Sequence, residues 1–152
     1  MTTAASDEID ILEKAKRDLA PDYVPSESEE YMGEQHQTYF RMLLIEWKRS
    51  IHSAADHTLQ SLKDGPIREA DLTDRASSET DWGIELRTRD RQRKLIAKID
   101  SALRRIQEGE YGYCEVTGDP IGLKRLIARP VATMTVEAQE AHERREKISR
   151  DD

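Results

Sequence analysis

Cys114 lies in a glycine-rich segment, residues 109–130, whose spacing is typical of a small zinc-binding knuckle. Structural zinc needs about four cysteine or histidine ligands. Ribbon-type spacing places two pairs of ligand positions seventeen residues apart, at Cys114, Thr117, Thr135 and Ala138. Because Cys114 is the only cysteine of the chain, we expect that zinc is not bound and that packing and hydrogen bonds hold the knuckle together. The expected apolar cluster consists of Tyr111, Tyr113, Val116, Ile121 and Leu126.

Two carboxylates, Asp71 and Asp74, lie three residues apart at the expected start of a helix. In the ordinary interpretation they cap this helix and interact favourably with its dipole. The alternative is that they lie at the end of a long exposed arm and reach into a channel of another protein, where they meet bases or a metal. In that interpretation Ala76 is a small residue that permits close approach.

A basic stripe follows one face of the next helical stretch. Its members, separated by four, three, four and seven residues, are Arg87, Arg91, Lys94, Lys98 and Arg105. The ordinary interpretation is the solvated flank of a coiled coil. If the knuckle folds against the base of this helix, however, Lys98 and Arg129 converge on one anion. In an acidic protein this small cluster favours a compact phosphorylated ligand over a nucleic-acid backbone.

The composition limits the classes of protein. Of the 152 residues, 36% are hydrophobic and 36% are charged, so an elongated helical protein is expected rather than one with a large core. The net charge of -7 argues against general nucleic-acid binding. A single cysteine excludes an internal disulfide, and no apolar run is long enough for a signal peptide or a membrane span, so we expect a cytoplasmic protein. No catalytic motif is found, so an enzyme is not expected.

The elements that position these groups are two long helices. Apolar residues recur at steps of three and four from Gln37 to Leu62 and again within Ser77 to Glu108. Such stripes predict an antiparallel coiled-coil hairpin, with a mainly α fold overall. The expected units are an N-terminal segment that is flexible or part of the globular end (1–34), the hairpin (35–108) with its tip near 64–76, the knuckle (109–134) and a C-terminal helix (135–152).

Five short motifs resemble the DksA family, bacterial regulators that bind RNA polymerase. They are EEYM at Glu29, DRA after Asp71 and Leu72, ELRTRDRQRKLIAKID from Glu85, YGYC at Tyr111 and IARP at Ile127. The resemblance covers about Glu29 to Lys147 and is closest to members that lack the full four-cysteine zinc site.

The resemblance implies a hairpin that enters the secondary channel of RNA polymerase, with the tip residues Asp71, Asp74 and Ala76 near the active site. It implies a pocket for ppGpp, shared with the polymerase, at Leu95, Lys98 and Arg129. The implied outcome is destabilised open complexes, with ribosomal RNA promoters inhibited and some biosynthetic promoters activated during starvation. Gln139 replaces a common family lysine near ppGpp, and Leu72 replaces a common proline at the tip.

Two other interpretations stay open at this point. One is a coiled-coil adaptor with no polymerase role, in which the tip and the basic face dock other proteins. The other, sequence-specific DNA binding through the knuckle, is disfavoured because an acidic chain without zinc offers no dedicated recognition helix. We expect a monomer. Which promoters respond, whether ppGpp is strictly required and whether Cys114 is redox-active are not determined by the sequence.

Overall fold

The computed structural model describes residues 5–63 and 72–151. The described helices are α1 (Ala5–Asp18), α2 (Glu34–Lys63), α3 (Leu72–Glu108), α4 (Leu123–Ala128) and α5 (Val136–Asp151). Strand-like pairing in the described ranges is limited to an isolated antiparallel bridge between Tyr113 and Pro120. The expectation of a mainly helical protein is confirmed.

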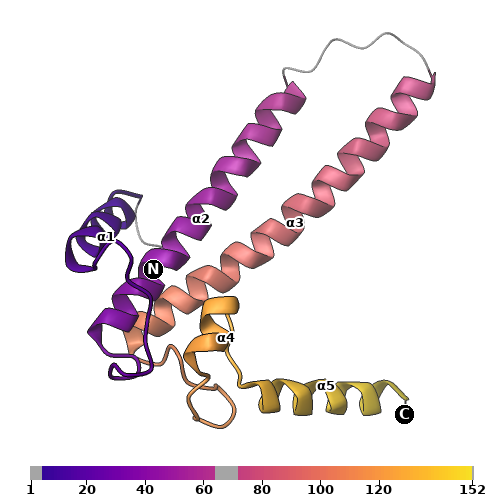
Figure 1. Ribbon diagram of the computed structural model, residues 1–152. Helices are drawn as coiled ribbons and strands as arrows, with labels where there is room; N and C mark the ends of the chain where they lie inside the picture. The colour runs from indigo at the N-terminus through magenta and orange to yellow at the C-terminus, as the bar shows by residue number, and fades with distance from the viewer. Residues whose placement is uncertain (1–4, 64–71, 152) are drawn as a thin grey trace.

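Helices α2 and α3 run antiparallel and form the hairpin that dominates the molecule (Figure 1). Their 30 and 37 residues correspond to lengths of about 45 and 55 Å. Apolar side chains at steps of three and four lie on the facing sides of the two helices near their base. The buried members of this seam are Phe40, Leu44, Ile51, Ile99, Ala102 and Ile106.

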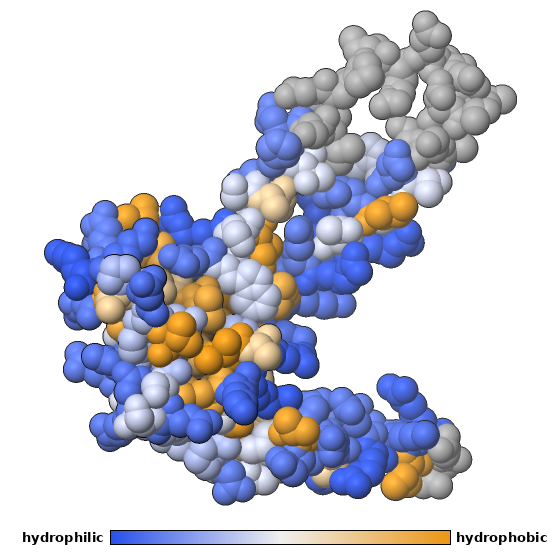
Figure 2. Space-filling model, viewed as in Figure 1, coloured by the Kyte–Doolittle hydropathy of each residue, from blue (hydrophilic) through white to orange (hydrophobic). Residues whose placement is uncertain are grey.

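The packed seam ends near Ile51, which corrects the expectation that the α2 stripe packs as far as Leu62. Ala54 is exposed, and on α3 Ile84 and Leu86 are 51% and 58% exposed. The two ribbons diverge toward their far ends (Figure 1). The stretch of α3 from Glu85 to Lys94 is polar apart from Leu86, which is exposed. Figure 2 accordingly shows mostly hydrophilic arms, with apolar side chains gathered at the base.

Helix α1 packs on α2 at the base of the hairpin. Ala15 and Leu19 are buried there. The ammonium group of Lys48 on α2 lies 3.0 Å from the Glu8 carboxylate of α1 and 2.9 Å from the Asp100 carboxylate of α3. Both carboxylates raise the pKa of Lys48 against the opposing effect of burial. One buried cation thus connects three helices.

The knuckle and α5 follow the hairpin. Gly109 follows the end of α3 with a φ of 76°, in the left-handed conformation that glycine adopts readily after a helix. Helix α4 packs into the core through Leu123 and Leu126, whereas α5 extends away from the base (Figure 1). None of the described helices combines the length and the apolar composition that crossing a membrane requires.

Candidate functional site

Two of the three expected tip residues, Asp74 and Ala76, lie in the described backbone. Asp71 is outside the described residues. Asp74 and Ala76 belong to the first turns of α3, which begins at Leu72 rather than near Ser77, and their side chains are outside the described part. The described start of α3 is at the end of the hairpin remote from the knuckle (Figure 1).

The basic face of α3 divides into two parts. Arg87, Arg91, Lys94 and Lys98 are exposed, and the Lys94 ammonium lies 3.1 Å from the Asp90 carboxylate one turn away. Arg105 differs, because its guanidinium donates to the carbonyl oxygens of Tyr113 at 2.7 Å and Glu110 at 3.3 Å. We therefore assign Arg105 to holding the knuckle rather than to the exposed basic face.

Lys98 and Arg129 come from two elements that pack on the same core cluster. Leu126 of α4 and Ile99 of α3 are buried in this cluster, and Leu95 packs against it. Arg129 follows directly as the C-cap of α4. The side chains of Lys98 and Arg129 are exposed and have no ion pair or hydrogen-bond partner in residues 5–63 and 72–151. Both charges are therefore available to an external anion.

The four zinc-ligand positions do not suit zinc. Burial of the Cys114 thiol acts to raise its pKa. Hydrogen bonds from the Thr117 hydroxyl and from the backbone N–H groups of Thr135, Thr117 and Val116 outweigh burial and lower the pKa to about 6. Thr135 uses its hydroxyl oxygen to accept the N–H of Ala138 at 3.2 Å. One sulfur, two hydroxyls and a methyl group cannot supply the ligands of a structural zinc site, and hydrogen bonds connect these positions instead.

The expected apolar cluster of the knuckle is only partly present. Tyr111, Ile121 and Leu126 are buried, and Tyr113 packs against them. Val116 is 60% exposed, so its inclusion was wrong. Its position in the turn that follows Cys114 directs the side chain to solvent, while its backbone N–H serves the sulfur.

Polar contacts of the knuckle were missed by the sequence analysis. The Tyr31 hydroxyl donates to the carbonyl oxygen of Gly112 at 2.6 Å and accepts the N–H of Gly122 at 3.0 Å. Arg125 donates to the carbonyl oxygen of Met134 at 2.9 Å. Tyr31 was noted only within the EEYM motif, and no spacing rule relates it to residues that lie 81 and 91 positions away.

Comparisons with known proteins agree with this architecture. The family model "DnaK suppressor protein DksA, N-terminal domain" matches residues 36–106, and "Prokaryotic dksA/traR C4-type zinc finger" matches residues 109–144. The RNA polymerase-binding transcription factor DksA of Caulobacter vibrioides (strain NA1000 / CB15N) is 60% identical over 131 residues, 86% of this chain and 92% of that protein. The protein of the same name from Escherichia coli (strain K12) is 38% identical over 82% of this chain and 83% of its own length.

Among solved structures, transcription factor DksA2 from Pseudomonas aeruginosa superposes with a TM-score of 0.70 at 42% identity, covering 81% of this chain and 93% of that one. A long helical hairpin on a base of zinc-finger type defines the class of protein. The chain belongs to the DksA family. The second family model is named for a four-cysteine zinc finger, whereas this chain retains one of the four cysteines at the expected positions.

Proposed function

We propose that this protein is a transcription regulator that binds RNA polymerase and inserts its hairpin through the secondary channel, so that the far end of the hairpin approaches the active site. It acts in the cytoplasm as a monomer, without sequence-specific DNA binding and without catalysis of its own. Together with ppGpp it destabilises open promoter complexes. Ribosomal RNA promoters are inhibited and some biosynthetic promoters are activated during starvation.

The observation that carries this proposal is a projecting hairpin, with little internal packing in its outer half, in a chain 60% identical to a named RNA polymerase-binding factor. Exposed apolar side chains on the arm, such as Ile84 and Leu86, are available to a partner. This similarity favours polymerase over the unrelated partner of a coiled-coil adaptor.

The exposed cations at the base support the ppGpp part of the proposal. Lys98 and Arg129 supply charges that suit phosphate groups, and Leu95 supplies an apolar neighbour. Position 139 contributes no cation, because Gln139 is neutral. Its amide nitrogen donates to the Glu143 carboxylate at 3.0 Å. We therefore propose that ppGpp binds through Lys98 and Arg129 in contact with polymerase, and that Gln139 leaves the pocket weaker than a lysine would.

In vitro transcription from a ribosomal RNA promoter with purified polymerase tests the tip. The Asp74→Asn variant removes one negative charge with almost no change in shape. We expect it to abolish inhibition while polymerase binding, measured in parallel by fluorescence anisotropy, is retained. If Asp74→Asn inhibits the promoter as well as the parent protein does, the proposed role of the tip is wrong.

The Lys98→Ala variant addresses the effector in the same assay. We expect a smaller enhancement by ppGpp and unchanged inhibition without ppGpp, because the lost ammonium contacts only the ligand. Equal enhancement in the variant and the parent protein would remove Lys98 from the site.

Failure of the parent protein to bind polymerase would favour the adaptor function instead.

A further inference from the structure

Helix α4 is held at both ends by tyrosine hydroxyls from other parts of the chain. At its start, the Tyr31 hydroxyl accepts the N–H of Gly122, the N-cap of α4. At its end, the Tyr111 hydroxyl donates to the carbonyl oxygen of Pro130 at 2.8 Å. Pro130 directly follows Arg129, whose own N–H bonds to the carbonyl oxygen of Arg125 at 2.7 Å. The two hydroxyls thus bracket the segment that carries Arg129.

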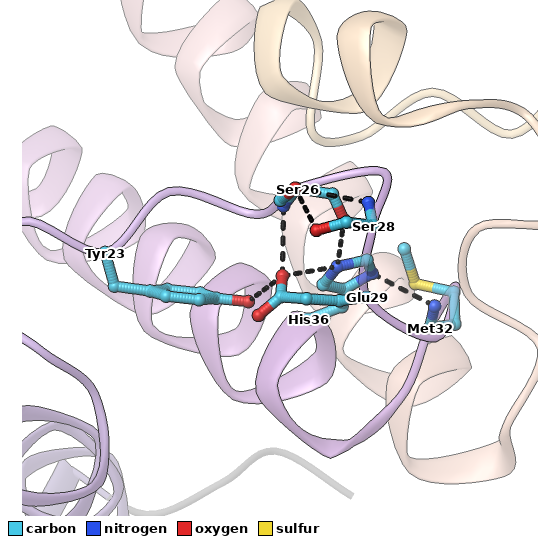
Figure 3. Close-up of polar contacts among 6 residues, drawn as sticks. All are labelled: Tyr23, Ser26, Ser28, Glu29, Met32 and His36. Carbon is cyan, nitrogen blue, oxygen red and sulfur yellow. Dashed lines mark hydrogen bonds and ion pairs between the residues drawn. The ribbon is translucent and has the colours of Figure 1, made fainter.

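Tyr31 belongs to residues 23–33, a segment that we call the strap. A polar network connects other residues of the strap to His36 of α2 (Figure 3). The Glu29 carboxylate accepts hydrogen bonds from the Tyr23 hydroxyl at 2.7 Å and from the Ser26 N–H at 3.0 Å. It also lies 3.1 Å from Nε2 of His36, which is buried on α2. Hydrogen bonds from Ser26 and then Tyr23 are the main causes that lower the pKa of Glu29. The carboxylate therefore stays ionised as the centre of the network.

A further hydrogen bond joins the strap to α2 at Met32, the residue that follows Tyr31. Nδ1 of His36 accepts the backbone N–H of Met32 at 3.1 Å, and Met32 has a φ of 55°, in the left-handed region that non-glycine residues seldom occupy. A non-glycine residue keeps such a conformation only where its surroundings impose it. The hydrogen bond to His36 is one such contact.

Met32 also leaves no room beside it for a side chain at Gly112. A Cβ atom built on Gly112, which has a φ of 92°, would lie 2.7 Å from Cγ of Met32. The strap and the knuckle are therefore in close contact at the residue whose carbonyl oxygen accepts the Tyr31 hydroxyl.

In a zinc ribbon, the metal fixes the positions of the loops that carry its ligands. In this knuckle those positions lack the ligands, and fixed tyrosines contact both ends of α4. We propose that Tyr31 and Tyr111 are positioning residues that hold α4 on the hairpin, so that Arg129 lies ready to bind the phosphates of the effector. The effector part of this inference rests on the proposed function, whereas the holding of α4 does not.

Two measurements on the full-length Tyr31→Phe variant test the inference. Phenylalanine keeps the ring, which packs edge-on against Tyr113 at a centroid distance of 5.7 Å, and removes only the hydroxyl. We expect faster amide hydrogen exchange at Gly122 and through α4. In the transcription assay, we expect the half-maximal ppGpp concentration to rise about fivefold, which corresponds to losing the one hydrogen bond that Tyr31 makes to the start of α4, at Gly122. Inhibition without ppGpp should be unchanged.

The matched control is Tyr39→Phe. Like Tyr31, Tyr39 packs against the hydrophobic core cluster, and its ring lies edge-on to Tyr23 and Phe40. Its hydroxyl has no hydrogen-bond partner in the part of the chain that the structure describes. We expect both exchange at Gly122 and the ppGpp midpoint to match the parent protein. Tyr111→Phe repeats the test at the other end of α4 and should accelerate exchange near Arg129.

Each outcome decides a separate point. Unchanged exchange in α4 of Tyr31→Phe would overturn the positioning role, whatever ppGpp does. Faster exchange with an unchanged ppGpp midpoint, in a parent protein that responds to ppGpp, would overturn the link to Arg129. If the parent protein does not respond, the proposed effector function and its link to Tyr31 fail, while exchange at Gly122 still decides whether Tyr31 holds α4.

Discussion

Cys114 shows how a single residue adapts to a site that has lost its metal ligands. Its thiol is buried, which favours the neutral form, yet hydrogen bonds from Thr117 and from backbone N–H groups favour the thiolate and lower the pKa to about 6. Hydrogen-bond donors of the kind that suit a metal-bound sulfur thus favour the ionised form of this thiol. Cys114 is 3% exposed, so these donors act on a sulfur that is largely removed from water.

This pKa predicts a pH dependence of stability. An unfolded thiol titrates near pH 8.5, so between about pH 6 and 8.5 the unfolded state binds more protons than the folded state, and stability increases with pH. The contribution of Cys114 is complete above about pH 8.5 and is lost as the pH falls through about 6. Cys114→Ser, which does not ionise in this range, should lack it.

Denaturant midpoints of the parent protein and of Cys114→Ser at several pH values measure this contribution. Titration of all other groups is shared by the two proteins, so their difference isolates Cys114. The advantage of the parent protein should grow from pH 6 to pH 8.5. A constant difference over this range would show that the folded thiol is not acidic.

Helix α1 is held on the hairpin by an ionic contact as well as by apolar packing. Lys48 is 11% exposed at its side chain and serves Glu8 and Asp100 together. Charged groups removed from water are costly unless they are paired, so removal of the shared cation leaves two carboxylates without their partner. Surface pairs such as Lys94 with Asp90 lie in water and contribute far less.

Lys48→Ala should therefore lower the free energy of unfolding by about 3 kcal/mol. The matched control Lys94→Ala removes an exposed pair of the same type and should change it by less than about 0.5 kcal/mol. Chemical denaturation followed by circular dichroism gives both values. Similar losses in the two variants would show that the junction of α1, α2 and α3 does not depend on the buried cation.

The molecule as a whole combines a stable base with an arm that has little packing of its own. Tyrosine hydroxyls, Arg105 and Arg125 hold the base together where other zinc knuckles use metal. A chelator should therefore leave the melting temperature unchanged, because Thr117, Thr135 and Ala138 cannot serve with Cys114 as the ligands of a structural zinc. A fall in melting temperature on chelation would contradict the absence of zinc.

A matched variant sharpens this comparison. Thr117→Cys, Thr135→Cys and Ala138→Cys together restore four thiols at the ribbon positions. This triple variant should bind zinc, detected by elemental analysis, and should melt at a lower temperature once the zinc is chelated. A variant that takes up no zinc would show that the backbone no longer brings the four positions to one point.

The sequence predicted the elements of this molecule better than their contacts. Apolar residues at steps of three and four, such as Phe40 and Leu44, identified the two long helices. The same pattern overestimated how far the helices pack, because Ala54 fits the stripe but is exposed. The exposed charges Lys98 and Arg129 could be proposed as a pair because each lies in a recognisable motif.

Local periodicity by itself predicted two long helices with apolar stripes, since helix formation depends on neighbours three and four positions away. The glycine spacing around Cys114 predicted the knuckle. Only the tertiary structure decided which distant groups meet. Tyr31 reaches Gly122 across 91 positions, and Lys48 reaches Glu8 across 40. Such contacts depend on how whole elements pack, and the spacing of residues along the chain contains no record of that packing.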